Sequence, residues 1–474
     1  MMGQDPRLFN MAQSNRPYAT LAIVSASYLL LIVDSSIAIA ALPLIKADLA
    51  FSNASLSWVQ NAYALSFGGL LLLGSRIGDI FGRKKMFVIG LTFFTLASLL
   101  VGLASNASVM ILARVLQGAG AAVLAPSTLA MLSTSFPVDP GRGRAMAVYS
   151  SITGAGTSLG LVMGGWITDA LSWRWAFFFN IPIGVALVLA SILFLPETNR
   201  HNAKIDYWGA ITSWAGMSLV VFGLVNAAEK GWGNSTTLGT FIGGILLLLW
   251  FVQIEKQVAQ PLIPLRLFAH AKRTGGNAGR FLFVGAMGGF WFFVSQFLQN
   301  VMGLNPLQTG LAFLPMTLAS FAVAFLVPGL SRKFGEAPFL AGGLALVAIG
   351  LFWLGQFQPY GSYLTQVAFP MLLVGFGQGA ATIRLTSAGM TELAPEDVGA
   401  GSGLVSTAVQ LGNAFGLSLV IALAGGVSVA DLGATQAFVS QAHAALIASA
   451  VLALLALVTV SILVLPNRQK KERP

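Results

Sequence analysis

The sequence predicts an all-α protein that crosses a membrane many times. Of its 474 residues, 56% are hydrophobic and only 9% are charged, whereas a soluble domain carries about a quarter charged residues. The apolar residues form continuous runs, such as 241–252, and do not alternate with polar residues as in the roughly ten-residue strands of a membrane β-barrel. A helical span needs about 20 apolar residues, and such runs recur from Tyr18 to the region of Leu465.

Apolar runs separated by polar breaks predict about fourteen spans. These spans begin near Tyr18, Ser57, Met86, Val109, Arg144, Ala176, Trp208, Leu238, Phe281, Leu307, Pro338, Tyr363, Gly403 and Ala444. The stretch before Tyr18 is polar, and the first apolar run has full spanning length with no small-residue cleavage site after it. We therefore expect no removable signal peptide.

The basic residues predict how these spans are oriented. With a cytoplasmic N-terminus, the loops on that side hold most of the Lys and Arg residues, Arg332 and Arg384 among them. The opposite side holds only Lys46, Arg174 and Lys230. Because basic loops stay on the cytoplasmic side, we expect a multi-pass protein of the inner (plasma) membrane with both termini in the cytoplasm. This placement accounts for the net charge of +10, so we expect lipid and small molecules as partners and no nucleic acid.

An internal repeat divides the chain into two related parts. Residues 81–82 and their basic neighbours are echoed at 332–335, residues 118–122 at 377–381, and the glycines at 156 and 160 at 412 and 416. Parallel repeats of this kind place a substrate site between the two halves near the membrane midplane. We assign 1–200 to an N-terminal six-helix bundle, 201–273 to two extra spans and a cytoplasmic linker, and 274–474 to a C-terminal six-helix bundle.

Two ionisable residues lie deep inside predicted spans. Asp34 is in the first span and Arg114 is in the fourth, at comparable depth on the outer side of the midpoint. Charges inside a membrane are costly and mark functional sites. We predict that the two residues pair, and that opening and closing of the pair takes up and releases a proton. The alternative is a static pair that only fixes packing. Leu373 aligns with Arg114 in the second half, so proton coupling is expected in the first half.

The loop after the second span carries a specific motif. Residues 74–85 read GSRIGDIFGRKK, which resembles the GxLaDrxGrkxxl motif of the major facilitator superfamily. Its glycines allow helix ends to approach, its aspartate can accept from a neighbouring helix N-terminus, and its cations can bind carboxylates or helix C-termini. We predict a conformational latch formed by Gly74, Gly78, Asp79, Gly82, Arg83 and Lys84. The alternative is that the cations only set the topology.

Further motifs resemble one branch of this superfamily. Residues 114–120 resemble its RxxqGxg motif, and the fifth span has a glycine face, Gly156, Gly160, Gly164 and Gly165, that permits close helix contact. This face resembles the antiporter motif gxxxGPxxGG, with Leu161 in place of the proline. Residues 173–182, 260–268 and 303–315 look like the fourteen-helix drug:proton antiporter branch.

This resemblance implies the major facilitator fold, with two six-helix bundles plus two extra spanning helices. It also implies efflux of drugs, dyes or biocides, often cationic amphiphiles, in exchange for protons across a bacterial plasma membrane. An exporter of one endogenous metabolite or siderophore on the same fold is the alternative, because the motifs do not distinguish the two.

A central cavity needs apolar and aromatic walls with few polar groups. The candidate substrate contacts are Trp58, Asn61, Tyr63, Gln117, Tyr149, Trp291, Phe292, Gln296 and Asn300. For each aromatic residue the alternative is a packing or lipid-facing role. Since the second half offers no deep acid, Asp34 is expected to serve both the proton and a cationic substrate.

Other classes of protein fit the sequence less well. An enzyme needs a nucleophile or a metal cluster, but the chain has no cysteine and its three histidines, His201, His270 and His443, are scattered. We therefore expect no catalytic residue, no metal and no cofactor, with the proton gradient as the energy source. A channel needs a polar ring or filter sequence, which we do not find. A non-transporting scaffold or sensor would not need the Asp34 and Arg114 pair. We also expect the protein to be a monomer.

Overall fold

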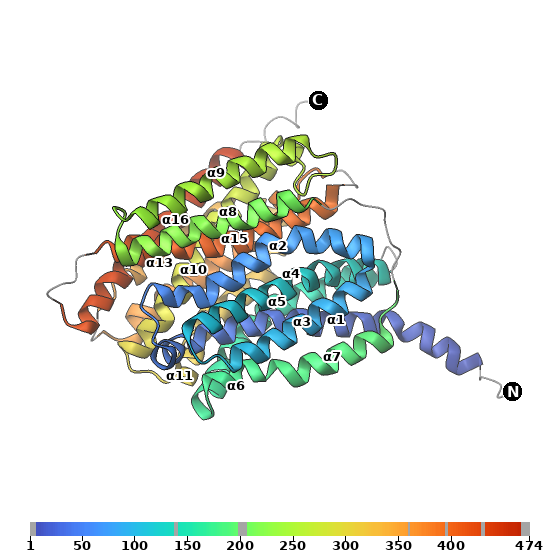
Figure 1. The fold of residues 1–474 in the computed structure, drawn as a ribbon, viewed down its shortest axis with the longest axis horizontal. Coiled ribbons are helices and arrows are strands. Elements are labelled where there is room, and N and C mark those ends of the chain that lie inside the picture. Colours follow the sequence, from blue (N-terminus) through green and yellow to red (C-terminus); the bar gives the residue numbers. More distant parts are fainter. Residues whose placement is uncertain are drawn as a thin grey trace.

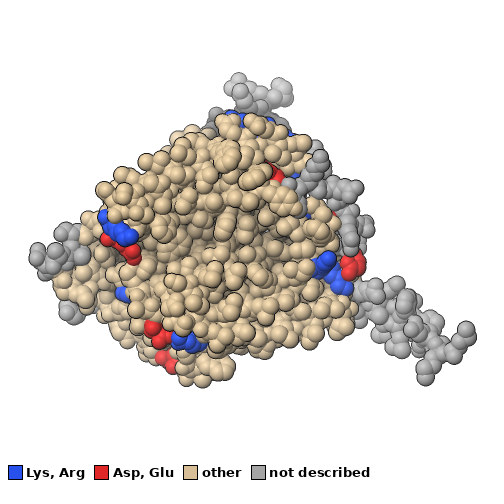
Figure 2. All heavy atoms as spheres, viewed as in Figure 1, with Lys and Arg blue, Asp and Glu red and all other residues tan. Residues whose placement is uncertain are grey.

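The computed structural model describes residues 6–136, 141–197, 206–358, 361–393, 397–427 and 432–465. Within these ranges the chain is a bundle of long helices whose axes are roughly aligned (Figure 1). Thirteen helices in the described ranges are long and apolar enough to cross a membrane, which confirms the predicted fold class. The charged residues visible in Figure 2 gather toward the edges of the bundle and leave the middle of that face without charge.

The first half comprises eight elements. They are α1 (Pro6–Leu49), η1 (Ser55–Ser57), α2 (Trp58–Phe81), α3 (Arg83–Gly102), α4 (Ala107–Ser135), α5 (Gly141–Ala170), α6 (Trp173–Phe178) and α7 (Asn180–Phe194). Helices α6 and α7 together form one span that is interrupted at Phe179. Helix α5 is not among the thirteen, but its 30 residues reach about 45 Å at 1.5 Å per residue, which is enough to cross.

Two further helices and a short 3-10 turn lead into the second half. They are α8 (Tyr207–Lys230), α9 (Ser235–Gln257) and η2 (Leu265–Phe268). The second half then comprises α10 (Ala271–Asn300), α11 (Pro306–Ala312), α12 (Leu314–Phe334), α13 (Ala337–Leu354), the π-helical turn η3 (Leu364–Ala368), α14 (Phe369–Gly389), α15 (Val398–Gly425) and α16 (Ala434–Leu463).

Two span starts and one loop assignment predicted from the sequence are wrong. Helices α10 and α16 begin about ten residues before the predicted starts at Phe281 and Ala444, because polar residues in their first turns read as loop. In α10, for example, buried Arg273 donates to the backbone carbonyl of Leu267 at 2.6 Å. Arg384, predicted in a loop, lies inside α14 with 9% of its surface exposed and pairs with Glu336.

The two halves contact each other at one end of the bundle and along its middle. This end, called here the distal end, is formed by the α1–α2 loop, α6 and the start of α11 (Figure 1). Near it, Ser295 Oγ donates to the Ile39 carbonyl and Gln299 Nε2 to the Ala40 carbonyl, both at 3.0 Å. Closer to the middle, α2 packs along α15. These contacts hold the distal end closed in this conformation.

The α8–α9 hairpin contacts both halves, because α8 packs against α15 and α2. At the far end of α9, the nearly buried Glu255 accepts the backbone N–H groups of Leu262 and Ile263 at 3.3 and 2.8 Å. Arg76 of α2 donates to the carbonyl of Pro261 at 3.3 Å. The linker after α9 is therefore attached to the helix that carries the predicted latch. The predicted boundaries between the three parts of the chain stay a prediction.

The α10–α15 contact gives a test of this packing. A Cβ on Gly416 would lie 2.1 Å from the Gly285 Cα, whereas a Cβ on Gly243 of α9 would meet nothing within 4 Å. Gly416→Ala should therefore lower the thermal unfolding midpoint, since overpacking costs about 1–3 kcal/mol. Gly243→Ala should leave it unchanged or raise it, because alanine favours helix over glycine by about 1 kcal/mol. Equal midpoints for the two variants would contradict the α10–α15 packing.

Candidate functional site

The centre of the first half is a buried carboxylate, Asp34 of α1. It is fully buried. Its Oδ2 accepts from Arg114 Nη1 at 2.9 Å, and its Oδ1 accepts from Gln117 Nε2 at 2.8 Å and from Asn180 Nδ2 at 2.6 Å. Hydrogen bonds to an ionised group are stronger than neutral ones. The structure thus brings Asp34 and Arg114 into contact, while their role in proton coupling stays a prediction.

Arg114 of α4 is as deeply buried as Asp34, with 1% of its surface exposed. Its Nε donates to the Val59 carbonyl at 2.8 Å and its Nη1 donates to Gln117 Oε1 at 2.6 Å. The ring of Tyr63 lies 4.4 Å from the guanidinium carbon, a distance at which an aromatic face attracts a cation. A carboxylate, an amide, a carbonyl and an aromatic ring therefore share the charge.

This charge network joins α1, α2, α3, α4 and α7. Two of its members, Ser98 and Asn180, were not predicted as site residues from the sequence. Ser98 Oγ accepts from Gln117 Nε2 at 2.8 Å, and Asn180 begins α7. An isolated amide after the apolar run 175–179 was the available signal for Asn180. Gln117 and Tyr63, predicted as substrate contacts, lie inside the network and contact Arg114.

The network constrains what Asp34 can bind. Both carboxylate oxygens are occupied by donors and the side chain is sealed from solvent. The predicted double role, in which one carboxylate serves the proton and a cationic substrate in turn, therefore requires that these contacts break first. Losing either charge would leave the other buried without its partner, which is strongly destabilising.

The predicted latch lies at the end of the bundle opposite the distal end. Gly82, with φ of 98°, ends α2 in a conformation that favours glycine, and α3 begins at the next residue. Asp79 pairs with Arg83, the first residue of α3, and Lys84 Nζ lies 3.9 Å from Glu197 Oε1.

The latch glycines allow close packing. A Cβ on Gly74 would lie 2.2 Å from the Ala122 carbonyl oxygen of α4, and a Cβ on Gly78 would lie 3.0 Å from Arg83 Nη1. All of these contacts are within the first half, so the role of the loop as a latch between conformations stays a prediction.

The glycine face of α5 holds the helix that carries Asp34. A Cβ on Gly160 would lie 3.0 Å from the Val33 backbone, and its neighbours Gly156 and Gly164 face α1 one turn before and one turn after. Gly165 faces the second half instead, because a Cβ there would lie 2.3 Å from the Pro306 carbonyl oxygen of α11. Helix α5 therefore contacts both α1 and the opposite half.

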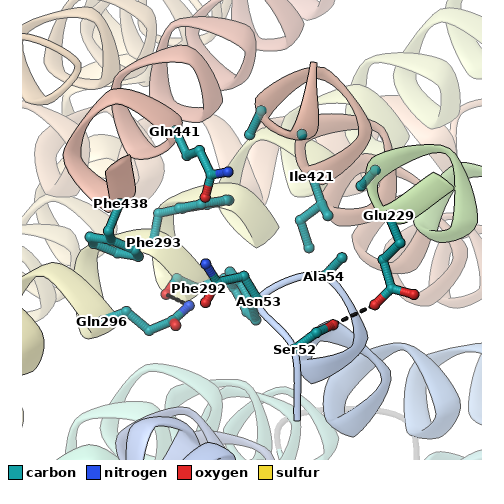
Figure 3. A pocket seen from close by; sticks show the side chains of 13 residues that line it. Ser52, Asn53, Ala54, Glu229, Phe292, Phe293, Gln296, Ile421, Phe438 and Gln441 are labelled. Atoms are coloured by element: carbon teal, nitrogen blue, oxygen red, sulfur yellow. Dashed lines mark hydrogen bonds between the residues drawn. The ribbon is translucent and has the colours of Figure 1, made fainter. Parts of the chain in front are cut away.

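A pocket opens at the distal end, away from the charge network (Figure 3). Its volume is about 200 Å³, and it is lined by Ser52, Asn53, Ala54, Ala228, Glu229, Phe292, Phe293, Gln296, Ile421, Ala424, Gly425, Phe438 and Gln441. Ser52 donates to the Glu229 carboxylate across its mouth. Two predicted contacts, Phe292 and Gln296, form part of its wall, and Gln296 Oε1 has no hydrogen-bond partner among the described residues. Because drug-sized sites occupy about 300–1,000 Å³, this pocket holds only a fragment of such a molecule.

The remaining predicted contacts are spread over the bundle. Asn61 Nδ2 donates to Ser418 Oγ at 2.8 Å across the two halves, and Tyr149 stacks on Tyr28 with ring centroids 4.6 Å apart. Trp58 packs on Phe222, Trp291 packs on Phe313, and Asn300 is exposed at the end of α10. In this conformation the described part of the chain does not gather the predicted contacts into one cavity.

Comparisons with known proteins agree with this architecture. The family described as the Major Facilitator Superfamily matches residues 24–417. The cephamycin export protein of Amycolatopsis lactamdurans is 38% identical over 86% of this chain and 85% of its own length. The puromycin resistance protein of Streptomyces alboniger is 35% identical over 87% of this chain and 82% of its own length. A crystal structure of an auto-inhibited peptide transporter of the POT family superposes with a TM-score of 0.68 at 15% identity, covering 97% of this chain and 99% of that one.

A double-mutant cycle tests the charge network. Arg114→Gln leaves the Asp34 carboxylate buried without a cation, so it should destabilise the protein by about 3–5 kcal/mol. Adding Asp34→Asn removes the stranded charge and should recover part of this loss, which unfolding of the purified variants would measure. As a control, Asp48→Asn breaks a pair whose side chains are 33% and 45% exposed and should cost at most about 1 kcal/mol. Strict additivity of Asp34→Asn and Arg114→Gln would contradict the network.

Proposed function

The chain belongs to the Major Facilitator Superfamily, and we propose that it is a proton-coupled exporter of drugs, dyes or biocides in a bacterial inner membrane. The names of its relatives support the export part of this proposal, because the proteins cited above are described as exporting cephamycin and as conferring resistance to puromycin. The many apolar helices make it a multi-pass membrane protein. The positions of the basic residues support a cytoplasmic location for both termini.

The observation that carries the proposal is the buried pair of Asp34 and Arg114. Burying charged side chains inside a membrane costs free energy, so a charged pair there indicates a functional site. Protonation of Asp34 removes one of the two charges and weakens every bond that Arg114 and Gln117 make to it. The network spans α1, α2, α3, α4 and α7, so a change of protonation state alters the packing of much of the first half.

The contacts between the halves support alternating access as the transport cycle. In such a cycle the halves rock about a central site, and the distal contacts of Ser295 and Gln299 break when that end opens. A net hydrogen bond contributes about 1 kcal/mol, and one charge crossing 100 mV supplies about 2.3 kcal/mol. The free energy from one proton moving down its gradient is therefore large enough to shift the equilibrium between a closed and an open distal end.

A narrower substrate range is the second candidate. The relative described as a cephamycin export protein is named for one class of compound, which favours an exporter of a single metabolite on the same fold. The two candidates share the proton-coupling mechanism, and a substrate screen separates them.

The test of the proposal uses purified protein in liposomes loaded with a pH-sensitive dye. Under an imposed proton gradient, adding an exported drug should produce proton movement with the wild-type protein. Asp34→Asn should abolish this movement, because the amide does not exchange a proton. Asp48 is an acid at the distal surface. Asp48→Asn should keep the proton movement and serves as the matched control. Drug-dependent proton movement that persists in Asp34→Asn would contradict the proposed coupling residue, and response to one compound alone would favour the narrow exporter.

A further inference from the structure

Arg280 is an arginine inside a span without an acidic partner among the described residues. Arg280 lies nine residues after the start of α10, about 14 Å along the helix at 1.5 Å per residue. Of other arginines within spans, Arg114 and Arg384 pair with carboxylates, whereas Arg76 of α2 donates to the Pro261 carbonyl. Arg273 donates to four backbone carbonyls. In the described part of the chain, no carboxylate forms an ion pair with Arg280.

The sequence explains why no acid in the second half can supply this partner. From residue 274 onward the acids are Glu336, Glu392, Glu396, Asp397, Asp431 and Glu472. All of them lie outside the membrane-spanning segments of that half. In the first half, Asp34 already has three donors. At the level of Thr382 and Thr386, the acid that reaches α14 is Glu336, and it pairs with Arg384 instead of Arg280.

The neighbours of Arg280 leave part of its donor capacity unused. Its Nη1 donates to the Thr382 carbonyl at 2.9 Å and to Thr386 Oγ1 at 2.7 Å. Its Nε is shielded from solvent and finds no acceptor among the described residues, although a guanidinium has five N–H donors in a fixed fork. The side chain as a whole is only partly buried.

The polar neighbours of Arg280 belong to one face of α14. On the side of α14, Gln378, Thr382 and Thr386 follow one another at four-residue spacing, which places them on one helix face. The guanidinium of Arg280 therefore lies beside a polar face of the second half.

We propose that Arg280, together with Thr386, binds an anionic group of the exported molecule, such as a carboxylate or a phosphate. An unpaired charge inside a membrane is costly until an opposite charge reaches it, and the arginine fork matches the two oxygens of such a group. This inference rests on the proposed function and adds to it a preference for amphiphiles that carry an acid. The first half then holds the proton-binding carboxylate, and the second half holds the cation that recognises the substrate.

A matched pair of dyes tests this inference. Rhodamine 110 carries a free carboxylate, and rhodamine 123 is its methyl ester, so the two differ only in the proposed anchor. Dye binding to the purified protein, followed by fluorescence polarisation, should favour the acid in the wild type. Arg280→Gln should weaken binding of the acid by roughly 10- to 100-fold, as expected for a hydrogen-bonded charge pair. It should leave the affinity for the ester unchanged, and Arg280→Lys should keep part of the preference.

Arg273→Gln is the matched control, because Arg273 lies two turns earlier on α10 and its bonds go to backbone carbonyls. It should lower the unfolding midpoint while the ratio of acid to ester affinity stays as in the wild type. An equal loss of both dyes in Arg280→Gln, no preference for the acid in the wild type, or binding of neither dye would overturn the inference.

A phospholipid headgroup carries the same kind of anionic group as the proposed substrate, so a separate experiment must distinguish the two. Competition of phosphatidylglycerol with rhodamine 110, combined with no transport of that dye in liposomes, would assign Arg280 to lipid and overturn the substrate site. Proton movement driven by rhodamine 123 reports on the proposed function alone. Its persistence in Arg280→Gln, with unchanged dye selectivity, would reject this inference and keep the exporter.

Discussion

The ion pair between Asp34 and Arg114 is the constraint on which the rest of the first half depends. In an apolar bundle, neither charge is tolerated without the other and without further hydrogen bonds. Val59 of α2, Gln117 of α4 and Asn180 of α7 supply those bonds. The helices must therefore approach closely and in one register, and the glycines of α5 allow α1 to reach the required position.

The two halves share an architecture but differ in their charges. The first half balances its deep cation with a deep acid, whereas the second half holds the deep cation Arg280 without one. Helix α5 connects the two, since its glycines contact α1 on one side and its residue Gly165 contacts α11 on the other. A change at Asp34 can therefore reach the contact between the halves through packed helices, with no need for a mobile loop.

Much of the fold and part of the site could be predicted from the sequence. Hydropathy located most spans within a few residues, and depth along the helices was enough to pair Asp34 with Arg114. Hydropathy failed where tertiary contacts satisfy polar groups, as at the start of α10, where backbone carbonyls surround Arg273. For the same reason Arg384 was placed in a loop, although it lies inside α14. The partners Ser98 and Asn180 come from distant parts of the chain, and no local pattern brings them to Asp34. Substrate contacts were the least predictable, because aromatic residues serve packing equally well.

The central claim is that the protonation state of Asp34 controls whether the distal end is closed. The chain has no cysteine, so spin labels can be placed at Ser105→Cys and Gln356→Cys, two exposed positions near the distal end of opposite halves. The distance between them, measured by double electron–electron resonance, should change between high and low pH in the otherwise wild-type protein. In Asp34→Asn it should stay at the low-pH value at every pH, because the amide mimics the protonated acid. A pH-dependent distance that is the same in both proteins would contradict the account.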